Sequence, residues 1–311
     1  MNGLKKDLEE YLAIRRALGY ELRRYEIPLG NFVAFLGEKQ AHYITLKLAL
    51  DWAKQSSSDH PKTWARRLSM IRGFAKHMTA IDSRTEIPPL GLFSNQPKRK
   101  CLPYIYADDE VHSLLHDARK LRPTDGMRPW TYSTIFGLLW ATGMRISEVL
   151  NLDRSDVDLS AGLLKIRNTK FGKSRFVPIH ATTQTALQSY ASRRDQIFPS
   201  ARTSAFFLTS VATRPTREVV NMTFLQLSRQ IGLRTADASS GPRIHDMRHS
   251  FIVRSLVNLY KRKISDLDRQ VYTLSVYVGH VDPSTTYWYM TAVPELLSLA
   301  RQRIEQKQGV I

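Results

Sequence analysis

The segment at residues 280–290, HVDPSTTYWYM, places two tyrosines shortly after a histidine and a proline. A tyrosine oxygen can attack phosphorus and hold the product covalently, which splits one difficult exchange into two easier steps. If residues 284–290 form a helix, Tyr287 and Tyr289 point ~200° apart at ~100° per residue. They cannot serve the same face, so we expect one to be a nucleophile that faces a cationic site. The other should pack with or beside Trp288.

Candidate partners for such a nucleophile precede it in the chain. The segment ATGMRISEVL contains Arg145 and, three residues on, Glu148, which would share a helix face. The segment RIHDMRHSF places His245 and Arg248 at i and i+3, so one helix face presents an imidazole and a guanidinium. Guanidinium groups bind phosphate oxygens bidentately, and a lysine with a lowered pKa can protonate a departing alkoxide. The candidate catalytic residues are Arg145, His245, Arg248 and His280, together with Lys170 or Lys173 of a predicted hairpin and one of the two tyrosines.

Each of these residues has an ordinary alternative role. A helix arginine usually forms a surface ion pair, a histidine more often packs or caps, and a hairpin lysine is usually solvated. The ordered set, rather than any one residue, therefore favours phosphoryl-transfer chemistry.

Other chemistries lack their motifs in this sequence. The segment FGKS ends like a phosphate-binding loop, but Arg167 occupies the position of the required earlier glycine. The chain has no His-Glu-x-x-His, no G-x-S-x-G and no cysteine pair, since Cys101 is its only cysteine. The acidic run of residues 108–110 could suggest a metal site. It begins a predicted helix, however, where neighbouring side chains point in different directions and do not converge on one ion. We expect no cofactor, no metal and no use of nucleotide energy.

The net charge of +18, from 46 basic against 28 acidic residues, indicates a polyanionic partner. The basic excess is present in residues 1–100 and in the remainder, so it does not come from a detachable tail. Nucleic acid is favoured over an anionic membrane surface, while a ribosome-associated or merely soluble basic protein is the alternative. With no apolar stretch near the ~20 residues of a membrane span, and no signal peptide, we expect a cytoplasmic protein.

The first part of the chain, residues 1–90, is predicted to be a helical domain. Apolar residues recur with a 3.6-residue period in LKKDLEEYLAIRRALGY and in TWARRLSMIRGFAKHM. The cations on the other faces of the second segment either are solvated or bind DNA phosphates. Four prolines and a glycine interrupt residues 82–104, so residues 91–105 are predicted to be a basic linker.

The second part, residues 106–311, is predicted to be mainly helical with a small sheet. WTYSTIFGLLWATG is apolar nearly all round and predicts a buried central helix. GLLKIRNTKFGKSRFVPI predicts two short strands joined by a turn that contains Gly172. From Pro294 the chain predicts a helix, because proline suits the first helical position. Its apolar stripe consists of Leu296, Leu297, Ala300 and Ile304. The helix docks either on its own domain or on a neighbouring subunit.

The order Arg, Lys, His-x-x-Arg, His, Tyr, within ATGMRISE, HDMRHSF and VGHVDPSTTYWY, resembles the tyrosine recombinase (phage integrase) family. The boxes of that family read A-T-G-x-R-x-S-E, H-x-L-R-H and L-G-H, with a tyrosine nine residues later. The resemblance covers essentially the whole chain. It implies a two-domain DNA clamp, with a helical core-binding domain followed by an α+β catalytic domain.

The resemblance also implies a role for each matching residue. Arg145 and Arg248 would clamp the phosphate, and Lys170 would be the general acid of the β-hairpin. His245 and His280 would assist proton transfer and phosphate binding, and Tyr289 would be the nucleophile. The expected DNA-binding residues are Arg66, Arg67, Arg72, Lys98, Arg99, Lys100, Lys173 and Arg175.

The implied activity is site-specific recombination of duplex DNA through a 3′-phosphotyrosyl link, for integration, excision or transposition of a mobile element. The implied assembly is a homo-oligomer on double-stranded DNA, a dimer per site and a tetramer at synapsis, joined by exchange of the helix at 294–311. The long segment between Arg248 and His280 resembles that of transposon-borne recombinases, which are sometimes encoded in adjacent groups. Sister recombinases are therefore candidate partners. The expected location is the bacterial cytoplasm, in association with the nucleoid. The alternatives are an idle DNA-binding protein and a topoisomerase of type IB.

Overall fold

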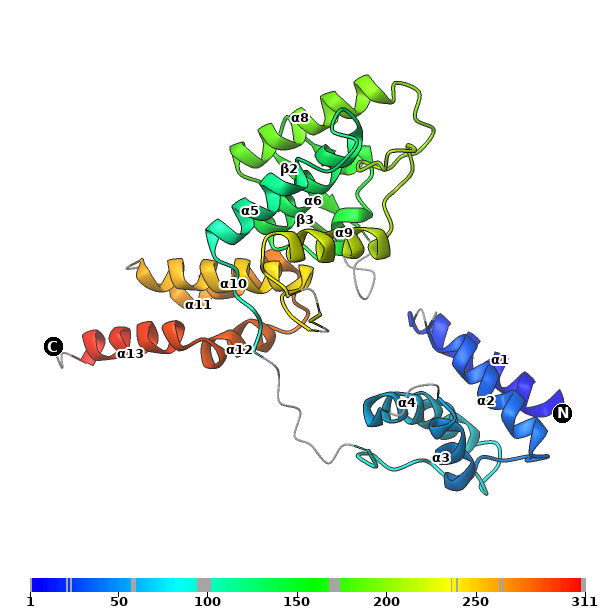
Figure 1. The fold of residues 1–311 in the computed structure, drawn as a ribbon. Helices are drawn as coiled ribbons and strands as arrows, with labels where there is room; N and C mark the ends of the chain where they lie inside the picture. The colour runs from blue at the N-terminus through cyan, green and yellow to red at the C-terminus, as the bar shows by residue number, and fades with distance from the viewer. Residues whose placement is uncertain are drawn as a thin grey trace. The chain divides into compact units, whose positions relative to one another are not determined.

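The computed structural model describes residues 2–20, 22, 24–56, 60–93, 102–167, 174–235, 237–238, 240–262, 264 and 266–308. The chain divides into two compact units, Met1–Cys101 and Leu102–Ile311 (Figure 1). The point of division lies inside the stretch predicted to be a linker, residues 91–105. Each unit has a hydrophobic core of its own.

The described part of the first unit contains four helices, as its periodicity predicts. They are α1 (Asn2–Ala17), α2 (Glu26–Glu38), α3 (Leu46–Lys54) and α4 (Pro61–Met78). Thr45 caps α3 by accepting the backbone N–H of Leu48, and Pro61 takes the first position of α4, where its missing N–H costs nothing. Phe32, Trp52 and the apolar stripe of α4 form the core.

The second unit is mainly helical with one small sheet, which confirms the predicted fold class. Its described helices are α5 (Asp108–Ala118), α6 (Met127–Thr142), α7 (Ile146–Leu150), the 3₁₀ turn η1 (Arg154–Asp156), α8 (Ala181–Ile197), α9 (Arg217–Gln230), α10 (Ile244–Lys261), α11 (Leu267–Val278), α12 (Ser284–Ala292) and α13 (Pro294–Gln308). Its described strands are β1 (Val157–Asp158), β2 (Leu163–Ile166) and β3 (Arg175–Pro178).

The sheet is antiparallel with strand order β1-β2-β3. Leu164 pairs with Val177, and both are fully buried because alternate strand residues face the core. At the other end of the ladder Ile166 pairs with Arg175. The predicted pair of strands is therefore confirmed, and the ladder leaves Arg175 at the start of β3.

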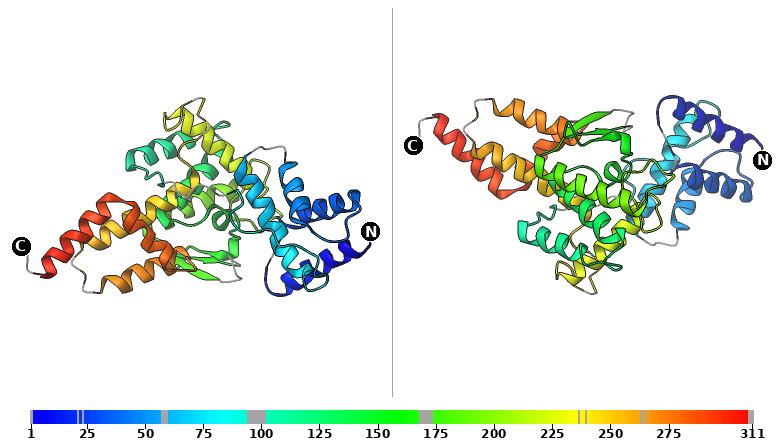
Figure 2. Two further views of the ribbon diagram at one scale, coloured as in Figure 1. Left: turned by 90° about the horizontal axis from the view of Figure 1, so that it is seen from below. Right: turned by 90° about the horizontal axis from the view of Figure 1, so that it is seen from above.

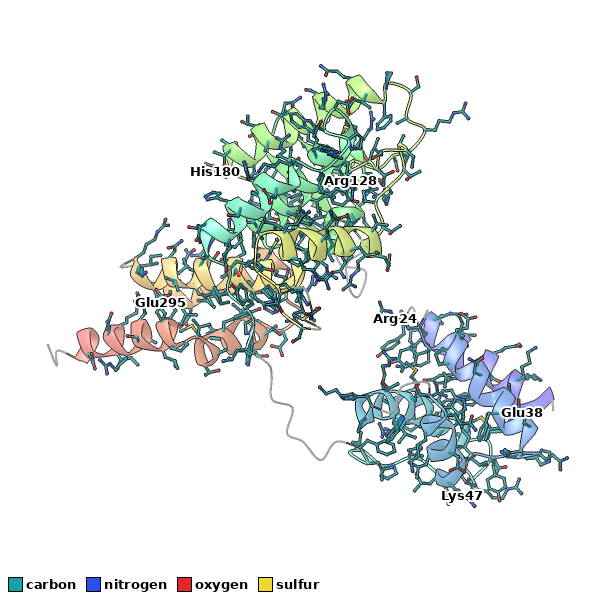
Figure 3. All side chains as sticks on the ribbon, viewed as in Figure 1. Arg24, Glu38, Lys47, Arg128, His180 and Glu295 are labelled. Carbon is teal, nitrogen blue, oxygen red and sulfur yellow. The ribbon has the colours of Figure 1, made fainter. Side chains whose placement is uncertain are left out.

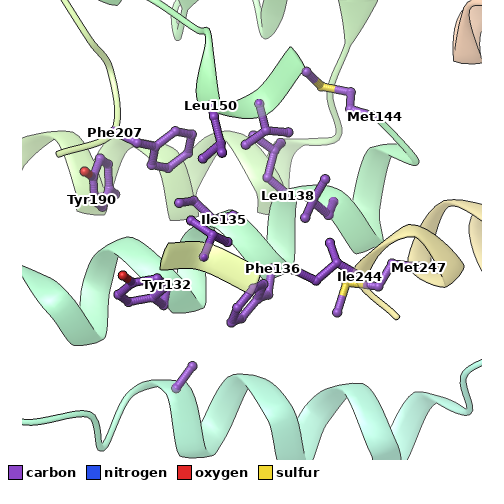
Figure 4. Close-up of a cluster of buried hydrophobic side chains, with 14 of the residues drawn as sticks. Tyr132, Ile135, Phe136, Leu138, Met144, Leu150, Tyr190, Phe207, Ile244 and Met247 are labelled. Carbon is purple, nitrogen blue, oxygen red and sulfur yellow. The ribbon is translucent and has the colours of Figure 1, made fainter. Parts of the chain in front are cut away.

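Helix α6 is the central helix of the second unit, as its apolar composition predicts. It packs against α5, α8 and α10. Figure 4 shows Ile135 and Phe136 of α6 among side chains from the surrounding elements, including Met247 of α10. The turn that follows α6 and the first turn of α10 are thus held against one core, and both carry candidate site residues.

A second cluster of buried side chains joins α10 to the last three helices. It contains Leu256 of α10, Val278 of α11, Tyr289 of α12 and Leu296 of α13. Figure 2 shows α13 beside α10 in both views, in agreement with their packing contacts. Near the start of α13, Glu295 (labelled in Figure 3) forms an ion pair with α10.

The apolar stripe predicted on α13 is divided in the structure. Leu296 is fully buried against its own unit, whereas the side chains of Leu297 and Ile304 are about half exposed, at 50% and 56%. Of the two alternatives for this helix, the structure therefore has docking on its own unit. The face that carries Leu297 and Ile304 is not part of that packing.

Candidate active site

Arg145 lies in the turn between α6 and α7, directly before the first residue of α7. Gly143 ends α6 with a φ of +61°, a left-handed conformation that glycine adopts without strain. A side chain there would collide with Phe251, because a Cβ atom would lie 2.4 Å from its Cδ1. The backbone N–H and the Nη1 of Arg145 both donate to Glu148, at 3.0 and 2.8 Å. This capping arrangement gives Arg145 and Glu148 the proximity that their spacing predicts.

Arg145 and Arg248 are tied to the backbone of the same two turns. Arg145 donates from Nη2 to the carbonyl of Gly279 at 2.8 Å. Arg248 donates to the carbonyls of Gly143 and Val278 at 2.8 and 2.7 Å, and only 4% of its surface is exposed. Burial first, and then the charge of Arg145, lower the pKa of Arg248 to about 9. The two positive charges repel each other, and an anion bound between them would relieve that repulsion.

Glu148 is a buried carboxylate shared between two arginines. Arg175 donates from Nη1 and Nη2 to its two oxygens, at 3.1 and 2.8 Å, and Arg145 donates to the same two oxygens. Burial disfavours the carboxylate, but the hydrogen bonds and charges of Arg175 and Arg145 outweigh it and lower the pKa of Glu148. Arg175 also donates from Nε to the carbonyl of Tyr277 at 2.9 Å. Its guanidinium thus links strand β3, helix α7 and the end of helix α11.

The DNA contact of Arg175 stays a prediction, while in the structure its guanidinium has partners inside the protein. Its side chain is only 12% exposed, and its guanidinium is occupied by the Glu148 carboxylate and a carbonyl. Gly279 lies against this group, because a Cβ atom there would be 2.7 Å from Nη1 of Arg175. Arg175 therefore has the contacts of a residue that positions Glu148, and through it Arg145.

Both predicted histidines lie near the arginine pair and are neutral. Burial and the charges of Arg248 and Arg145 lower the pKa of His280 to about 3. Its Nδ1 lies 2.7 Å from the hydroxyl oxygen of Thr286, within hydrogen-bonding distance. Loss of solvent around the His245 ring, and then the charge of Arg248, lower the pKa of His245. At neutral pH the two imidazoles can donate and accept hydrogen bonds, but they add no positive charge to the site.

Tyr289 and Tyr287 point to opposite sides of α12, as helical geometry predicts. Tyr289 is 3% exposed, its ring lies edge-on to Trp288, and its hydroxyl forms a hydrogen bond with Nδ1 of His249. Tyr287 is 42% exposed, with its hydroxyl 3.4 Å from Asp268. Tyr289 is therefore the tyrosine with a ring contact to Trp288, and Tyr287 lies at the surface.

The effect of the arginines on the Tyr289 pKa is outweighed by burial. Positive charge near a phenol favours the phenolate. Burial raises the pKa of Tyr289 to about 12, and the opposing effect of Arg248 is smaller. In the absence of DNA the hydroxyl is therefore protonated, and a reaction at neutral pH requires a group that removes its proton.

Five predicted cations lie outside the described residues. They are Lys98, Arg99, Lys100, Lys170 and Lys173. The first three belong to the predicted linker, and the other two fall between the strands β2 and β3. Their roles as DNA contacts and, for Lys170, as the general acid stay predictions.

The three arginines predicted on α4 have different surroundings. Arg67 stacks on the ring of Trp52 at 3.6 Å and donates to its carbonyl at 2.9 Å. Arg72 donates to the carbonyls of residues 88–89, at 2.6 and 2.7 Å. Arg66 is exposed. Contacts inside the unit thus engage Arg67 and Arg72, and Arg66 is the member of this set that faces solvent.

Two classes of feature are absent from the part of the chain that the structure describes. It contains no group of three or more histidine, cysteine, aspartate or glutamate side chains arranged to hold a metal ion. None of its helices is long and apolar enough to cross a membrane.

The contact of His249 with Tyr289 is the functional feature that sequence reasoning missed. His249 directly follows Arg248 in HDMRHSF, but its neighbour forty residues later could not be inferred from local spacing. The centroid of the His249 ring lies 4.8 Å from that of the His245 ring and 5.6 Å from that of the Tyr289 ring. The sequence signal that was available is the spacing of His245 and His249, which at i and i+4 lie on the same face of a helix.

Comparison with known proteins supplies a family for this arrangement. The family model described as "Phage integrase family" matches residues 105–295. The putative integrase/recombinase y4rB of Sinorhizobium fredii is 43% identical over 311 residues, which cover 99% of this chain and 98% of that protein. Tyrosine recombinase XerD of Staphylococcus epidermidis is 30% identical over 230 residues, 73% of this chain and 71% of that protein.

Two solved structures with the same fold are complexes with DNA. The Tn1549 transposon integrase with circular intermediate DNA aligns with a TM-score of 0.63 and 18% identity, over 96% of this chain and 99% of that chain. The XerH recombinase in a post-cleavage complex with its difH substrate aligns with a TM-score of 0.62 and 17% identity, over 92% of this chain and 78% of that chain.

Proposed function

Because this chain belongs to the phage integrase family and is a tyrosine recombinase, we propose that it cuts and rejoins duplex DNA through a 3′-phosphotyrosyl intermediate. Site-specific DNA recombination is the activity of the family. The observation that carries the finer proposal is the convergence of two guanidinium groups, from Arg145 and Arg248, on the turns that flank α7 and α12. Tyr289 lies in the same packed cluster as Val278, whose carbonyl holds Arg248.

In the proposed reaction the arginines bind the scissile phosphate. Their donors are already oriented by backbone carbonyls and by Glu148, so little reorganisation is required as negative charge develops on the phosphate oxygens. The hydroxyl oxygen of Tyr289 attacks phosphorus, and the bond to the 5′ oxygen breaks. Lys170 protonates that oxygen. Attack by a 5′ hydroxyl on the phosphotyrosine then rejoins the strand without an external energy source.

The neutral histidines suit hydrogen bonding in this scheme better than charge stabilisation. His280, held by its contact with Thr286, lies beside the carbonyls that orient the arginine pair. We assign His280 and His245 to hydrogen bonds with the phosphate or with the groups that exchange its protons. The positive charge is supplied by Arg145 and Arg248, together with Lys170.

DNA-backbone binding is proposed for cations of both units. Arg66 of α4 is exposed, and Lys173 and the run Lys98–Lys100 complete the set. Contacts of this kind position a protein on a duplex without reading its sequence. Such contacts would use part of the net charge of +18 to favour DNA binding, since each neutralised phosphate releases counterions.

A mobile element is the proposed substrate class. The relative from Sinorhizobium fredii is named an integrase/recombinase, and the Tn1549 enzyme is a transposon integrase solved with a circular DNA intermediate. We infer integration, excision or transposition as the role of this chain, with sister recombinases as candidate partners.

We propose that the protein acts as a homo-oligomer on DNA. A lambda integrase of the same fold has been solved as a dimer on a core site. In a dimer at each site and a tetramer at synapsis, α13 would leave α10 and dock on a neighbouring subunit. The exposed side chains of Leu297 and Ile304 support this proposal, because a second subunit could cover them.

A nicked suicide substrate tests the proposed reaction. Its short fragment diffuses away after cleavage, so a phosphotyrosyl enzyme accumulates as a covalent protein–DNA band. The result expected is such a band, linked to the 3′ phosphate. Tight binding with no band would instead indicate an idle DNA-binding protein. Relaxation of supercoiled DNA with no exchange between partner duplexes would indicate activity of the type IB topoisomerase kind.

A further inference from the structure

His249 lies at the point where the nucleophile meets helix α10. Its Nδ1 forms a hydrogen bond with the hydroxyl of Tyr289, and the two rings lie 5.6 Å apart at 50°. Tyr289 is almost completely buried, so water has little access to this hydroxyl. Among the residues that the structure describes, His249 is its hydrogen-bond partner.

Four of the other site residues are poorly placed to accept a proton from Tyr289. Arg145 and Arg248 are cations with no acceptor, and the Nδ1 of His280 is engaged with Thr286. The carboxylate of Glu148 is enclosed by two guanidinium groups. His249 in its neutral form with the proton on Nε2 presents a lone pair from Nδ1 directly to the hydroxyl.

We propose that His249 is a catalytic residue that accepts the proton of Tyr289 during strand cleavage, an assignment that rests on the proposed function. As the oxygen of Tyr289 bonds to phosphorus, its proton moves to Nδ1 of His249. The bond from phosphorus to the 5′ oxygen breaks, and its electron pair stays on that oxygen, which is protonated by Lys170. In rejoining, His249 returns the proton to the departing oxygen of Tyr289.

The surroundings of His249 make this transfer dependent on DNA. Burial and His245 lower the pKa of His249 to about 4, and burial raises that of Tyr289 to about 12, so the free protein keeps the proton on the tyrosine. The charged groups around the ring are Asp246 and Arg248 on α10 and Arg243 directly before that helix. A phosphodiester that binds the arginine pair adds a negative charge beside the imidazole, which favours the imidazolium. Bound substrate therefore prepares the acceptor.

Two substitutions separate proton transfer from positioning. His249→Asn places an amide oxygen close to the position of Nδ1, where it can accept the hydrogen bond but cannot take up the proton. His249→Ala removes both functions. The rate of covalent-complex formation is measured on the nicked suicide substrate, together with DNA affinity and the thermal unfolding midpoint of each variant. Tyr287→Phe, on the opposite side of α12, is the matched control.

Both His249 variants are expected to cleave ~10²–10⁴-fold more slowly, the usual contribution of a general base. Their DNA affinity should stay close to that of the wild type, and so should the unfolding midpoint of His249→Asn. A rate near that of the wild type for His249→Asn would overturn the assignment, since the hydrogen bond alone would then suffice. A rate near that of the wild type for His249→Ala would also overturn it. If the wild type itself formed no covalent complex, the proposed function would fail first.

Discussion

The arginine pair and the nucleophilic tyrosine of the candidate site are held by different kinds of contact. Arg145 and Arg248 donate to three backbone carbonyls and to a buried carboxylate, which fixes their orientation before any ligand binds. Tyr289 is held by apolar packing and by one neutral imidazole, with its proton retained. Under the proposed function, the phosphate-binding side is preorganised, while Tyr289 keeps its proton until substrate binds.

The largest effect is expected from removal of either guanidinium. Arg145→Ala and Arg248→Ala each remove donors that act on charge formed in the transition state, so cleavage should fall ~10²–10³-fold or more. Sequence-specific DNA binding should remain. Arg248→Lys accompanies Arg248→Ala, because the buried alanine variant could lose stability while lysine keeps the charge. Electrophoretic mobility shift and suicide-substrate assays measure the two quantities. Loss of binding in step with cleavage would make the arginines ground-state contacts.

A smaller effect is expected from the residue that positions Glu148. Arg175→Lys keeps the charge but loses the bidentate contact, so Arg145 should lose orientation and cleavage should fall about tenfold to a hundredfold. The loss should appear in the rate at saturating DNA and not in the affinity, since the Arg175 guanidinium is engaged by Glu148 and a backbone carbonyl. Arg167→Lys is the matched control, because Arg167 pairs with Asp153 and Asp156 and does not contact Glu148. A weaker DNA affinity with an unchanged saturating rate would instead indicate that Arg175 contacts DNA.

Truncation after Thr291 should lower formation of the synaptic complex more than binding of a single protomer. Because Leu296 is buried, truncation also exposes part of the core and should lower the unfolding midpoint. The double substitution Leu297→Ser, Ile304→Ser leaves that core intact and removes only exposed apolar contacts. Native gels with paired sites measure assembly. If the double variant assembles like the wild type, the exposed face of α13 does not bind a neighbouring subunit.

The smallest effect is expected on the first unit. Arg66→Ala should weaken DNA binding severalfold and reduce the slope of affinity against salt by about one unit, as for one lost phosphate contact. Arg67→Ala should instead lower the unfolding midpoint, because its guanidinium stacks on Trp52. Fluorescence anisotropy at several salt concentrations, with thermal unfolding alongside, makes the comparison. Equal salt slopes for Arg66→Ala and the wild type would remove Arg66 from the DNA contacts.

Much of this organisation could be predicted from the sequence, because it depends on local patterns. The 3.6-residue period of α4, the apolar composition of α6 and the two strands around Gly172 all follow from neighbouring residues. The spacing of Tyr287 and Tyr289 also predicts that they face opposite sides of one helix. Such features need no knowledge of which distant segments meet.

The features that sequence reasoning missed depend on contacts between distant segments. In the sequence, Arg175 is one more basic residue of a predicted hairpin. Its contact with Glu148 of α7 exists only in the folded protein. The neutral state of His280 and the raised pKa of Tyr289 result from burial that the packed helices α10 to α13 create together. Charge and residue type predict a phosphate site here, but protonation states require the packing.

The central claim is that Tyr289 attacks the phosphate, and the most direct test is to locate the covalent link. The protein is trapped on a nicked suicide substrate and digested, and the peptide that carries the nucleotide is sequenced by mass spectrometry. We expect the adduct on Tyr289, no adduct for Tyr289→Phe despite intact folding and DNA binding, and an adduct for Tyr287→Phe at close to the wild-type rate. An adduct on Tyr287, or one that persists in Tyr289→Phe, would contradict it.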